Sequence, residues 1–487
     1  MITGDYSPEK LITAVEKHHS INHLIDGYYD GDRHFPLLRN AAMGPLIQRL
    51  RMVVGWPAIV IDVLEERLDF LGWNCDEIDM ESVYENNDME YESGLCHIDT
   101  LLYGVGFMAV HTGADGEPGE IITAESAKNT SGVWNRRTRR LDVGFGYERN
   151  DDSHDITDVW VYEPDVTIHY NRKGIGAPWR SVESDRHNLH RVPMVRLANR
   201  GRAGRTQGKT EITRSIRSLT DAAVRTLLSA EVNREINSAP QRYVLGAKED
   251  SFTDANGLPI PGWRAVLGSL WNLERDEELM ERFPNSDGLP KVGQFPSNPP
   301  GPYFEQLEKM ALMVSAEGGV PPSMFGFVTD NPPSADSIRA LEGRLIKRAE
   351  RRQTSWTNGY RELCRIVGLM QGLTIPDAKD IEIQWRDPST PTKAADADRA
   401  VKLTQGQNPI LPADSSVTWD MVGLTKGEQR QLQKDRNKAT FRQMLMQQQQ
   451  AGGEPGGNAS AGSDATAQQP NGSGANAGVA GVQQNAG

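Results

Sequence analysis

The chain has 487 residues, of which 37% are hydrophobic and 24% are charged, and its formal net charge is −13. The length is too great for one ordinary domain, and the composition is typical of a folded protein. The acidic balance argues against a conventional DNA-binding protein, which needs a basic surface to neutralise phosphates. It does not argue against a channel, because a wall with the same sign of charge as DNA lets the DNA slide.

The sequence predicts neither a membrane segment nor a disulfide framework. The longest apolar run covers residues 52–61 and contains Gly55 and Pro57, whereas a spanning helix needs about 20 residues. The first residues lack the pattern of a signal peptide. Three cysteines lie far apart in the sequence, which favours a reducing compartment. We therefore expect synthesis in the cytosol.

Helical patterns dominate the first hundred residues. Ser7 and Pro8 are typical of a helix start, and a polar loop is expected at residues 26–32. A second helix is expected from Pro57, with Ile61, Leu64, Leu68 and Leu71 at helical spacing, and a third over residues 88–103.

The pattern changes to short strands between residues 105 and 182. Apolar runs at 106–110, 141–147, 159–162 and 166–170 are separated by Gly, Asp and Asn, which predicts a β-meander. A loop rich in Gly and Arg follows at residues 199–210. A helix is then expected over 211–237, and strands at 241–245 and 265–271 within a segment rich in Pro and Gly.

The clearest predicted element is a helix from Ala335 to about Gln371. Its apolar stripe contains Ile338, Leu341, Leu345, Trp356, Tyr360, Leu363, Val367 and Met370. A shorter helix over residues 303–317 precedes it. Residues 373–445 predict a small helical unit interrupted by prolines. The tail from residue 446 is poor in apolar residues and is expected to be disordered.

One loop resembles a phosphate-binding motif. Ala203–Thr210 fits a relaxed form of the pattern, in which backbone amides and a Lys hold phosphates before a helix. Ala203 stands where the stricter motif has Gly, and no acidic strand follows that would complete a nucleotide site. We expect a solvated loop here, and keep a nucleotide-dependent enzyme as the alternative.

Other chemical signals are weaker. Asp26, Asp30 and Asp32 lack the spacing of a calcium loop. The scattered histidine pairs lack further ligands, so no metal site, cofactor site or catalytic group is expected. The basic cluster Arg136–Arg140 is expected on a hairpin turn, where it either contacts a partner or is simply solvated.

Several segments, in a fixed order, resemble the portal proteins of long-tailed, siphophage-type bacteriophages. They are Tyr28–Gly31, Leu102–Val110, Glu125–Ser126, Val192–Val195, Asn199–Arg200, Gly208–Ala222, Ala239–Arg242, Gly246, Val320–Pro322, Phe325–Gly326 and Ser334–Glu342. Ala127 departs from the family, which usually has Pro there. The resemblance covers most of residues 20–372.

The resemblance implies an α+β, multi-domain portal fold that assembles into a ring, in which a long helix and a β-meander are built into wing, stem, clip and crown parts. The implied regions are a wing over 1–238, a clip with flanking strands over 239–300, a stem helix over 301–326, a tunnel loop over 327–334, a long wing helix over 335–372, a crown over 373–445 and a disordered tail over 446–487. The tunnel-loop residues Val328, Thr329, Asp330 and Asn331 would face DNA in the channel.

The resemblance also implies the partners. The chain would form a homo-oligomer, a dodecamer, at one capsid vertex of the virion after synthesis in the host cytoplasm. Double-stranded DNA would be packaged and ejected through its channel. The terminase, the head–tail adaptor, the major capsid protein and the scaffold protein would bind the ring, with no membrane and no enzymatic activity. Another minor structural virion protein is the second alternative.

Overall fold

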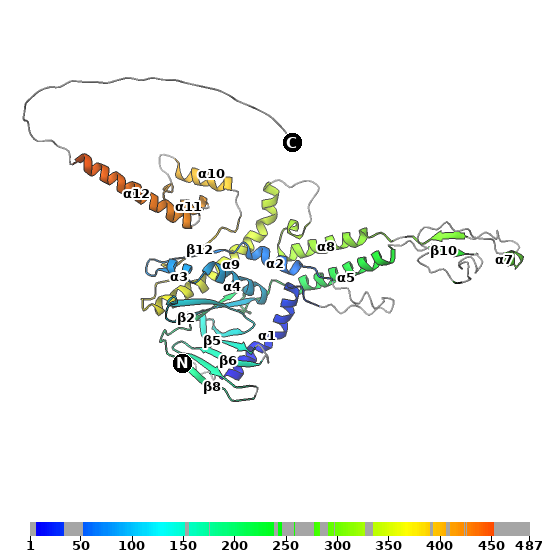
Figure 1. Ribbon diagram of the computed structural model, residues 1–487, viewed down its shortest axis with the longest axis horizontal. Helices are drawn as coiled ribbons and strands as arrows, with labels where there is room; N and C mark the ends of the chain where they lie inside the picture. The colour runs from blue at the N-terminus through cyan, green and yellow to red at the C-terminus, as the bar shows by residue number, and fades with distance from the viewer. Residues whose placement is uncertain are drawn as a thin grey trace, which may run out of the picture. The chain divides into compact units, whose positions relative to one another are not determined.

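The protein is described by a computed structural model (Figure 1). The described residues are 6–33, 52–150, 155–174, 176–237, 242–245, 258, 277–282, 291–296, 298–326, 335–389, 393–405, 410–422, 424 and 426–451. They fall into two units that divide between Thr390 and Pro391. Among these residues, no helix is both long and apolar enough to cross a membrane.

The first helix, α1, runs from Pro8 to Tyr29. Its apolar stripe continues through Ile25 and Tyr28, which are buried, so the loop that we predicted from residue 26 begins too early. The helix ends before Gly31, whose φ of 77° is a left-handed conformation that glycine tolerates.

The second helix, α2, spans Trp56–Glu65 and confirms the predicted start. Leu68 and Leu71 do not belong to it, contrary to our prediction, because Leu71 lies in strand β1 (Phe70–Asn74). Gly72 in that strand has a φ of 124°, a backbone angle that is incompatible with an α-helix. The aromatic ring of Phe70 stacks on Tyr360 at 4.1 Å between centroids, which holds the strand against the core.

Strand β1 pairs antiparallel with β12 (Glu382–Trp385), which follows it by about three hundred residues in the chain. Residues 373–389 therefore belong to the first unit, whereas we expected them to begin a separate helical unit. The pairing could not be read from local patterns, because each strand is short and its partner is distant.

Two helices, α3 (Met80–Asn86) and α4 (Met89–Tyr103), lead into a three-stranded antiparallel sheet. The strand order is β3-β2-β9, with β2 over Val105–Thr112, β3 over Glu120–Glu125 and β9 over Met194–Ala198. The helix predicted over 88–103 is confirmed by α4.

The second sheet has five strands in sequential order and confirms the predicted β-meander. The strands are β4 (Thr130–Asn135), β5 (Arg140–Arg149), β6 (Ile156–Tyr162), β7 (Thr167–Asn171) and β8 (Arg180–Asp185). The run at 106–110 is not part of it, contrary to our prediction, because β2 pairs with β3 and β9. Helix α1 packs on this sheet through Leu11 and Val15.

Helices α5 (Arg214–Asn237) and α8 (Gly301–Gly318) lie side by side (Figure 1). Beyond them in the chain, β10 (Arg242–Leu245) pairs antiparallel with β11 (Lys291–Gln294), and α7 (Glu277–Arg282) lies between these strands in sequence. The strand at 241–245 is confirmed. The one predicted at 265–271 lies outside the described residues.

The predicted starts of α5 and α8 differ slightly from those observed. Helix α5 begins three residues after Glu211, because the hydroxyl of Thr213 accepts a hydrogen bond from the backbone N–H of Ile216 at 3.3 Å and caps the helix there. Helix α8 begins two residues before the expected Tyr303.

The long helix α9 spans Ala335–Met370 and confirms the prediction. At about 1.5 Å per residue it is roughly 54 Å long. Its stripe is buried from Leu345 onward, with Trp356 and Tyr360 among the largest buried side chains. Leu341, which we placed in the same buried stripe, is 53% exposed, because the core that covers this face of the helix begins one turn later.

The second unit contains α10 (Lys393–Thr404), α11 (Ser416–Val422) and α12 (Lys426–Ala451). It is mainly helical, as expected. Helix α12 continues through residues 446–451, which we had placed in a disordered tail. Met and Gln are good helix formers, and the first glycines come only after Ala451. Residues 452–487 lie outside the described part.

Candidate functional site

The predicted tunnel-loop residues Val328, Thr329, Asp330 and Asn331 lie outside the described residues. The structure describes both ends of the segment that contains them. On one side, α8 is followed by the short 3-10 helix η3 (Pro322–Phe325), and on the other side α9 begins at Ala335.

A hydrogen bond joins the two helices that bracket this segment. Gly319 ends α8 with a φ of 66°, and its N–H donates to the carbonyl of Ser315. Arg344 of α9 donates a hydrogen bond to the carbonyl of Ala316 in α8. The Ser315 hydroxyl donates to the carbonyl of Val320 at 2.7 Å and holds the chain as it leaves the helix.

A buried carboxylate, Glu211, holds α9 to the rest of the first unit. It lies just before α5 and is 1% exposed. Its Oε2 is 2.5 Å from Nη2 of Arg348 and 3.3 Å from Nη1 of Arg200, and its Oε1 accepts a hydrogen bond from Arg352. Arg348 and Arg352 are one turn apart on α9, so both guanidinium groups reach the same acid.

Asn199 completes this network. Its side-chain amide donates to Oε1 of Glu211 at 3.0 Å, and its side-chain oxygen accepts from Nε of Arg352 at 3.0 Å. Its backbone N–H donates to the carbonyl of Gly104 at 3.0 Å, at the end of α4. The network therefore joins α4, the loop after β9, the start of α5 and the middle of α9.

The electrostatics of Glu211 favour its charged form. Burial alone would raise the pKa of this carboxyl, but Arg348, Arg352 and Arg200, with the Asn199 amide, together hold the pKa below its usual value. Burial also lowers the pKa of Arg348, against the opposing attraction of Glu211. The carboxylate is thus charged at neutral pH and balances the surrounding arginines.

The same network explains the loop that resembles a phosphate-binding motif. The backbone N–H of Lys209 donates to the carbonyl of Asn199 at 2.8 Å, and that of Glu211 donates to the carbonyl of Leu101 at 2.9 Å. Gly208 has a φ of 72° and packs so closely that a Cβ would clash with the carbonyl oxygens of Gly104 and Asn199. The amides of Lys209 and Glu211 thus bond protein carbonyls, and the preceding strand β9 is antiparallel to β2, unlike the parallel strand that precedes a phosphate-binding loop.

The titratable residues that the sequence singled out do not converge on one site. His97 is buried, with Nε2 at 2.8 Å from the Tyr360 hydroxyl, and burial lowers its pKa to about 3. His190 lies 2.6 Å from Asp165 at the surface. Asp26 is 3.0 Å from Lys128. Within the described parts of the chain, no group of three or more His, Cys, Asp and Glu side chains is placed to hold a metal ion.

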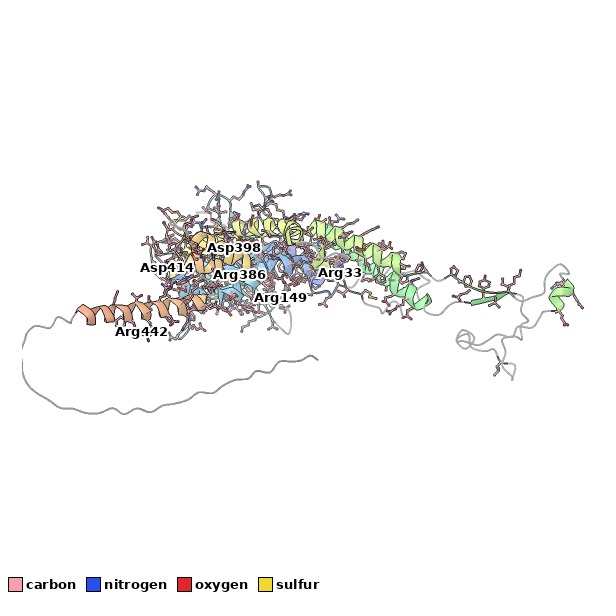
Figure 2. All side chains as sticks on the ribbon, turned by 90° about the horizontal axis from the view of Figure 1, so that it is seen from above. Arg33, Arg149, Arg386, Asp398, Asp414 and Arg442 are labelled. Atoms are coloured by element: carbon pink, nitrogen blue, oxygen red, sulfur yellow. The ribbon has the colours of Figure 1, made fainter. Side chains whose placement is uncertain are left out.

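Several large apolar side chains are exposed on α8, α9 and the β10–β11 hairpin. They are Phe304, Leu312 and Met313 on α8, Leu341 on α9, and Tyr243, Leu245 and Val292 on the hairpin. Figure 2 shows side chains projecting along the whole length of α5 and α8. Exposed apolar groups at this density are typical of surfaces that other chains cover.

Sequence reasoning predicted the start of α9 at Ala335 but missed the Glu211 network. Glu211 was noted only as the start of a helix. A signal was present, because Arg348 and Arg352 lie four residues apart on the same face of α9 as the buried Leu345. Two arginines on a buried face require a buried acid, but the sequence does not say which one.

The fold and site describe a multi-domain α+β protein whose long helices bracket one short segment, and in which we find no catalytic constellation among the described residues. Comparison with known proteins gives the class. The sequence pattern of the family described as "Phage portal protein, SPP1 Gp6-like" matches residues 11–411. The chain belongs to this phage portal protein family.

Two individual relatives support the family assignment. The chain is 30% identical over 425 residues to the portal protein of Mycobacterium phage L5, and the match covers 83% of each chain. It is 28% identical over 419 residues to the portal protein of Mycobacterium phage D29, again with 83% of each chain covered.

Solved structures also resemble the chain, at lower similarity. A chain in the structure described as "Virion of native gene transfer agent (GTA) particle" is 12% identical, with a TM-score of 0.41, and the match covers 83% of this chain and 93% of that one. A chain of "Neck of native GTA particle computed with C12 symmetry" is 11% identical, with a TM-score of 0.39 and coverages of 76% and 90%. The family assignment rests on the sequence matches alone.

Proposed function

We propose that this portal-family chain forms a ring of twelve copies at one vertex of the capsid, through which double-stranded DNA is packaged and ejected. The observation that carries the proposal is the family match over residues 11–411. The enzymatic alternative has no comparable support, and within the loop at 203–210 the amides of Arg205 and Lys209 are already bonded to protein carbonyls.

The exposed apolar side chains support assembly with further copies of the chain. Phe304 and Met313 of α8 are each 58% exposed, which is unfavourable for an isolated chain in water. The β10–β11 hairpin has only two strands among the described residues, and a two-stranded hairpin is marginally stable by itself. Neighbouring subunits in a ring would cover both features.

We assign the portal regions to the chain as follows. Residues 1–238 form most of the wing, 239–300 the clip, 301–326 the stem helix, 327–334 the tunnel loop and 335–372 the long wing helix. The crown begins at Pro391 instead of residue 373, because β12 pairs with β1 of the first unit. The clip faces the head–tail adaptor and, during packaging, the terminase; the major capsid and scaffold proteins contact the outside of the ring.

The mass of the purified particle tests the ring. Twelve chains of 53.9 kDa each weigh about 650 kDa, so native mass spectrometry of the full chain should show one species near that value. A stable monomer at high concentration would contradict the proposal.

A charge change in the tunnel loop tests its contact with DNA. We expect Asp330→Lys with Asn331→Lys to leave ring assembly intact but to reduce DNA packaging, because new cations would hold phosphates that must move past the loop. The matched control is Asp115→Lys, on the exposed turn between β2 and β3. If the loop variant and the control package equal amounts of DNA, the loop does not contact DNA in the channel.

The nucleotide alternative has its own test. We expect purified wild-type chain and Lys209→Ala to be equally inactive in an ATP hydrolysis assay. A turnover that depends on Lys209 would establish the enzyme instead.

A further inference from the structure

Two basic segments that are far apart in the sequence lie together in the first unit. The turn between β4 and β5 carries Arg136, Arg137 and Arg139, and Arg140 begins β5. The loop after β9 carries Arg202 and Arg205, which form an isolated bridge with each other. Arg139 of the turn lines two adjoining cavities, and Arg202 of the loop lines the larger of them. This concentration is unexpected in a chain whose net charge is −13.

We call the two cavities together the arginine groove. Their volumes are about 140 Å³ and 420 Å³, and they share Trp134, Arg139, Arg196, Asn358 and Gly359 as lining residues. The smaller cavity is also lined by Arg140 and Arg191, and the larger one by Arg202. Five arginines therefore face one hollow surface.

Glu362 forms ion pairs with two of these five arginines, Arg191 and Arg140, and the other three lack a carboxylate partner among the described residues. Glu362 already contacts Arg191, and it lies 3.8 Å from Arg140 and 3.6 Å from Arg365. Asp142 accepts hydrogen bonds from the side-chain amide of Asn135. Within the described part of the chain, Arg139, Arg196 and Arg202 have no carboxylate within ion-pair distance.

Arg196 is the recessed member of this set. Its guanidinium lies 3.9 Å from the centre of the Trp134 ring, and its Nη2 donates to the carbonyl of Thr206 at 3.2 Å. Its Nε is buried without an acceptor, as is the hydroxyl oxygen of Thr138 beside the same cavity. Burial lowers the pKa of Arg196 to about 10, so the group stays charged at neutral pH while its charge is poorly solvated.

We propose that the arginine groove is a docking site for an acidic segment of another polypeptide, with one carboxylate inserted beside Arg196. The inserted group would supply an acceptor for the buried Nε of Arg196 and a counter-charge for a guanidinium that has no carboxylate of the described residues within ion-pair distance. The exposed arginines at the rim, Arg139 and Arg202, would steer and hold the following acidic residues.

The shape of the groove favours a peptide over nucleic acid. Arg196 lines both cavities, and its guanidinium is recessed, with Nε buried. A DNA duplex carries its phosphates on a stiff, wide rod that meets exposed cations on a surface. A flexible chain can extend an Asp or Glu side chain to a recessed guanidinium.

The test uses the full-length protein and fluorescence anisotropy of a fluorescein-labelled oligoglutamate peptide, at an ionic strength of about 0.15 M. An oligoglutamine peptide and a DNA duplex of equal charge serve as comparison probes. The groove variant is Arg139→Gln with Arg202→Gln, because both side chains are exposed and their loss spares the fold. The matched control is Arg180→Gln with Arg442→Gln, two exposed arginines elsewhere in the chain.

We expect the groove variant to bind oligoglutamate about tenfold more weakly than the wild type, and the control variant to change binding by less than about twofold. Asn358→Trp should weaken binding similarly, because it fills the groove without changing the charge. The proposal is overturned by equal effects of the groove and control variants, by unchanged binding in Asn358→Trp, by tighter binding of the DNA duplex, or by no binding of oligoglutamate to the wild type.

Discussion

Removing the charge of Glu211 should destabilise the first unit more than any surface substitution. In Glu211→Gln, Arg348 and Arg352 stay close together with side chains that are 13% and 8% exposed, but their shared counter-charge is gone. Breaking a buried ion pair from one side costs about 3–5 kcal/mol, since an unpaired charge is left in a poorly solvated site. We expect a loss of that size in the free energy of unfolding.

The assay is equilibrium urea denaturation of the purified chain, with the change in midpoint converted through the slope of the transition. The control is Asp69→Asn, which breaks the 2.6 Å ion pair to Arg386; Arg386 is labelled in Figure 2. Those side chains are 40% and 64% exposed, so this loss should stay below about 1 kcal/mol. A Glu211→Gln variant as stable as this control would refute the role of the network.

A double-mutant cycle separates the network from general disturbance of the core. Arg352→Met alone leaves Glu211 with Arg348 and Arg200, so it should cost less than Glu211→Gln. The two changes together should cost clearly less than the sum of their separate effects, because the second removes a charge that the first left unpaired. Additive losses would mean that the two side chains act independently.

The stability that Glu211 contributes, measured as the difference between wild type and Glu211→Gln, should depend on pH. The pKa of Glu211 is lower in the folded chain than its usual value, so its contribution is complete above the unfolded pKa of about 4.3 and is lost as the pH falls through the folded pKa. The stability difference between wild type and Glu211→Gln should therefore be constant near neutral pH and should narrow below about pH 4. A difference that grows on acidification would contradict the assigned charge state.

Three further predictions follow from packing. Leu345→Ala should cost about 2–5 kcal/mol of unfolding free energy because Leu345 is fully buried, whereas Leu341→Ala should change it by less than about 0.5 kcal/mol; similar losses at both positions would mean that the exposed face of α9 is misassigned. Gly208→Ala should lower thermal stability, since the residue has a φ of 72° and no room for a Cβ; an unchanged melting temperature would show that the loop adapts. Deletion of residues 452–487 should leave the assembled particle at twelve chains, because that segment has no Leu, Ile, Met or aromatic residue to add to a core; a truncated chain that stays monomeric would disprove this.

The sequence predicted the long elements well. Helices α4, α8 and α9 have apolar residues at a sustained helical period, and α9 carries its stripe over ten turns. A pattern repeated this often outweighs local exceptions. The meander was predictable for a similar reason, since its short apolar runs alternate with turn residues.

Distant pairing was not predictable. Leu68 and Leu71 continue the helical spacing of α2. The chain nevertheless forms strand β1 there, because Phe70 and Trp73 pack against Tyr360 of α9, which is nearly three hundred residues later in the sequence. The pairing of β1 with β12 depends on the same long-range contact. Local periodicity contains no information about a partner of this kind.

In the candidate sites too, local patterns were predictable and contacts between distant segments were not. The segment that we predict to be the tunnel loop, residues 327–334, was delimited by the strong helical patterns on either side of it, which α8 and α9 confirm. The basic cluster at 136–140 was expected on a hairpin turn, and that prediction is confirmed. Its position beside the second basic loop follows from strand β5, next to β4, packing close to β9, which the sequence does not reveal.

We propose above that many copies of this chain surround a common axis and leave a central channel. Electron cryomicroscopy of the purified full-length particle tests it most directly. We predict end-on class averages of a closed ring with a central pore, wide enough for a DNA duplex. Particles that are solid at the centre, or chains that remain single, would contradict the account.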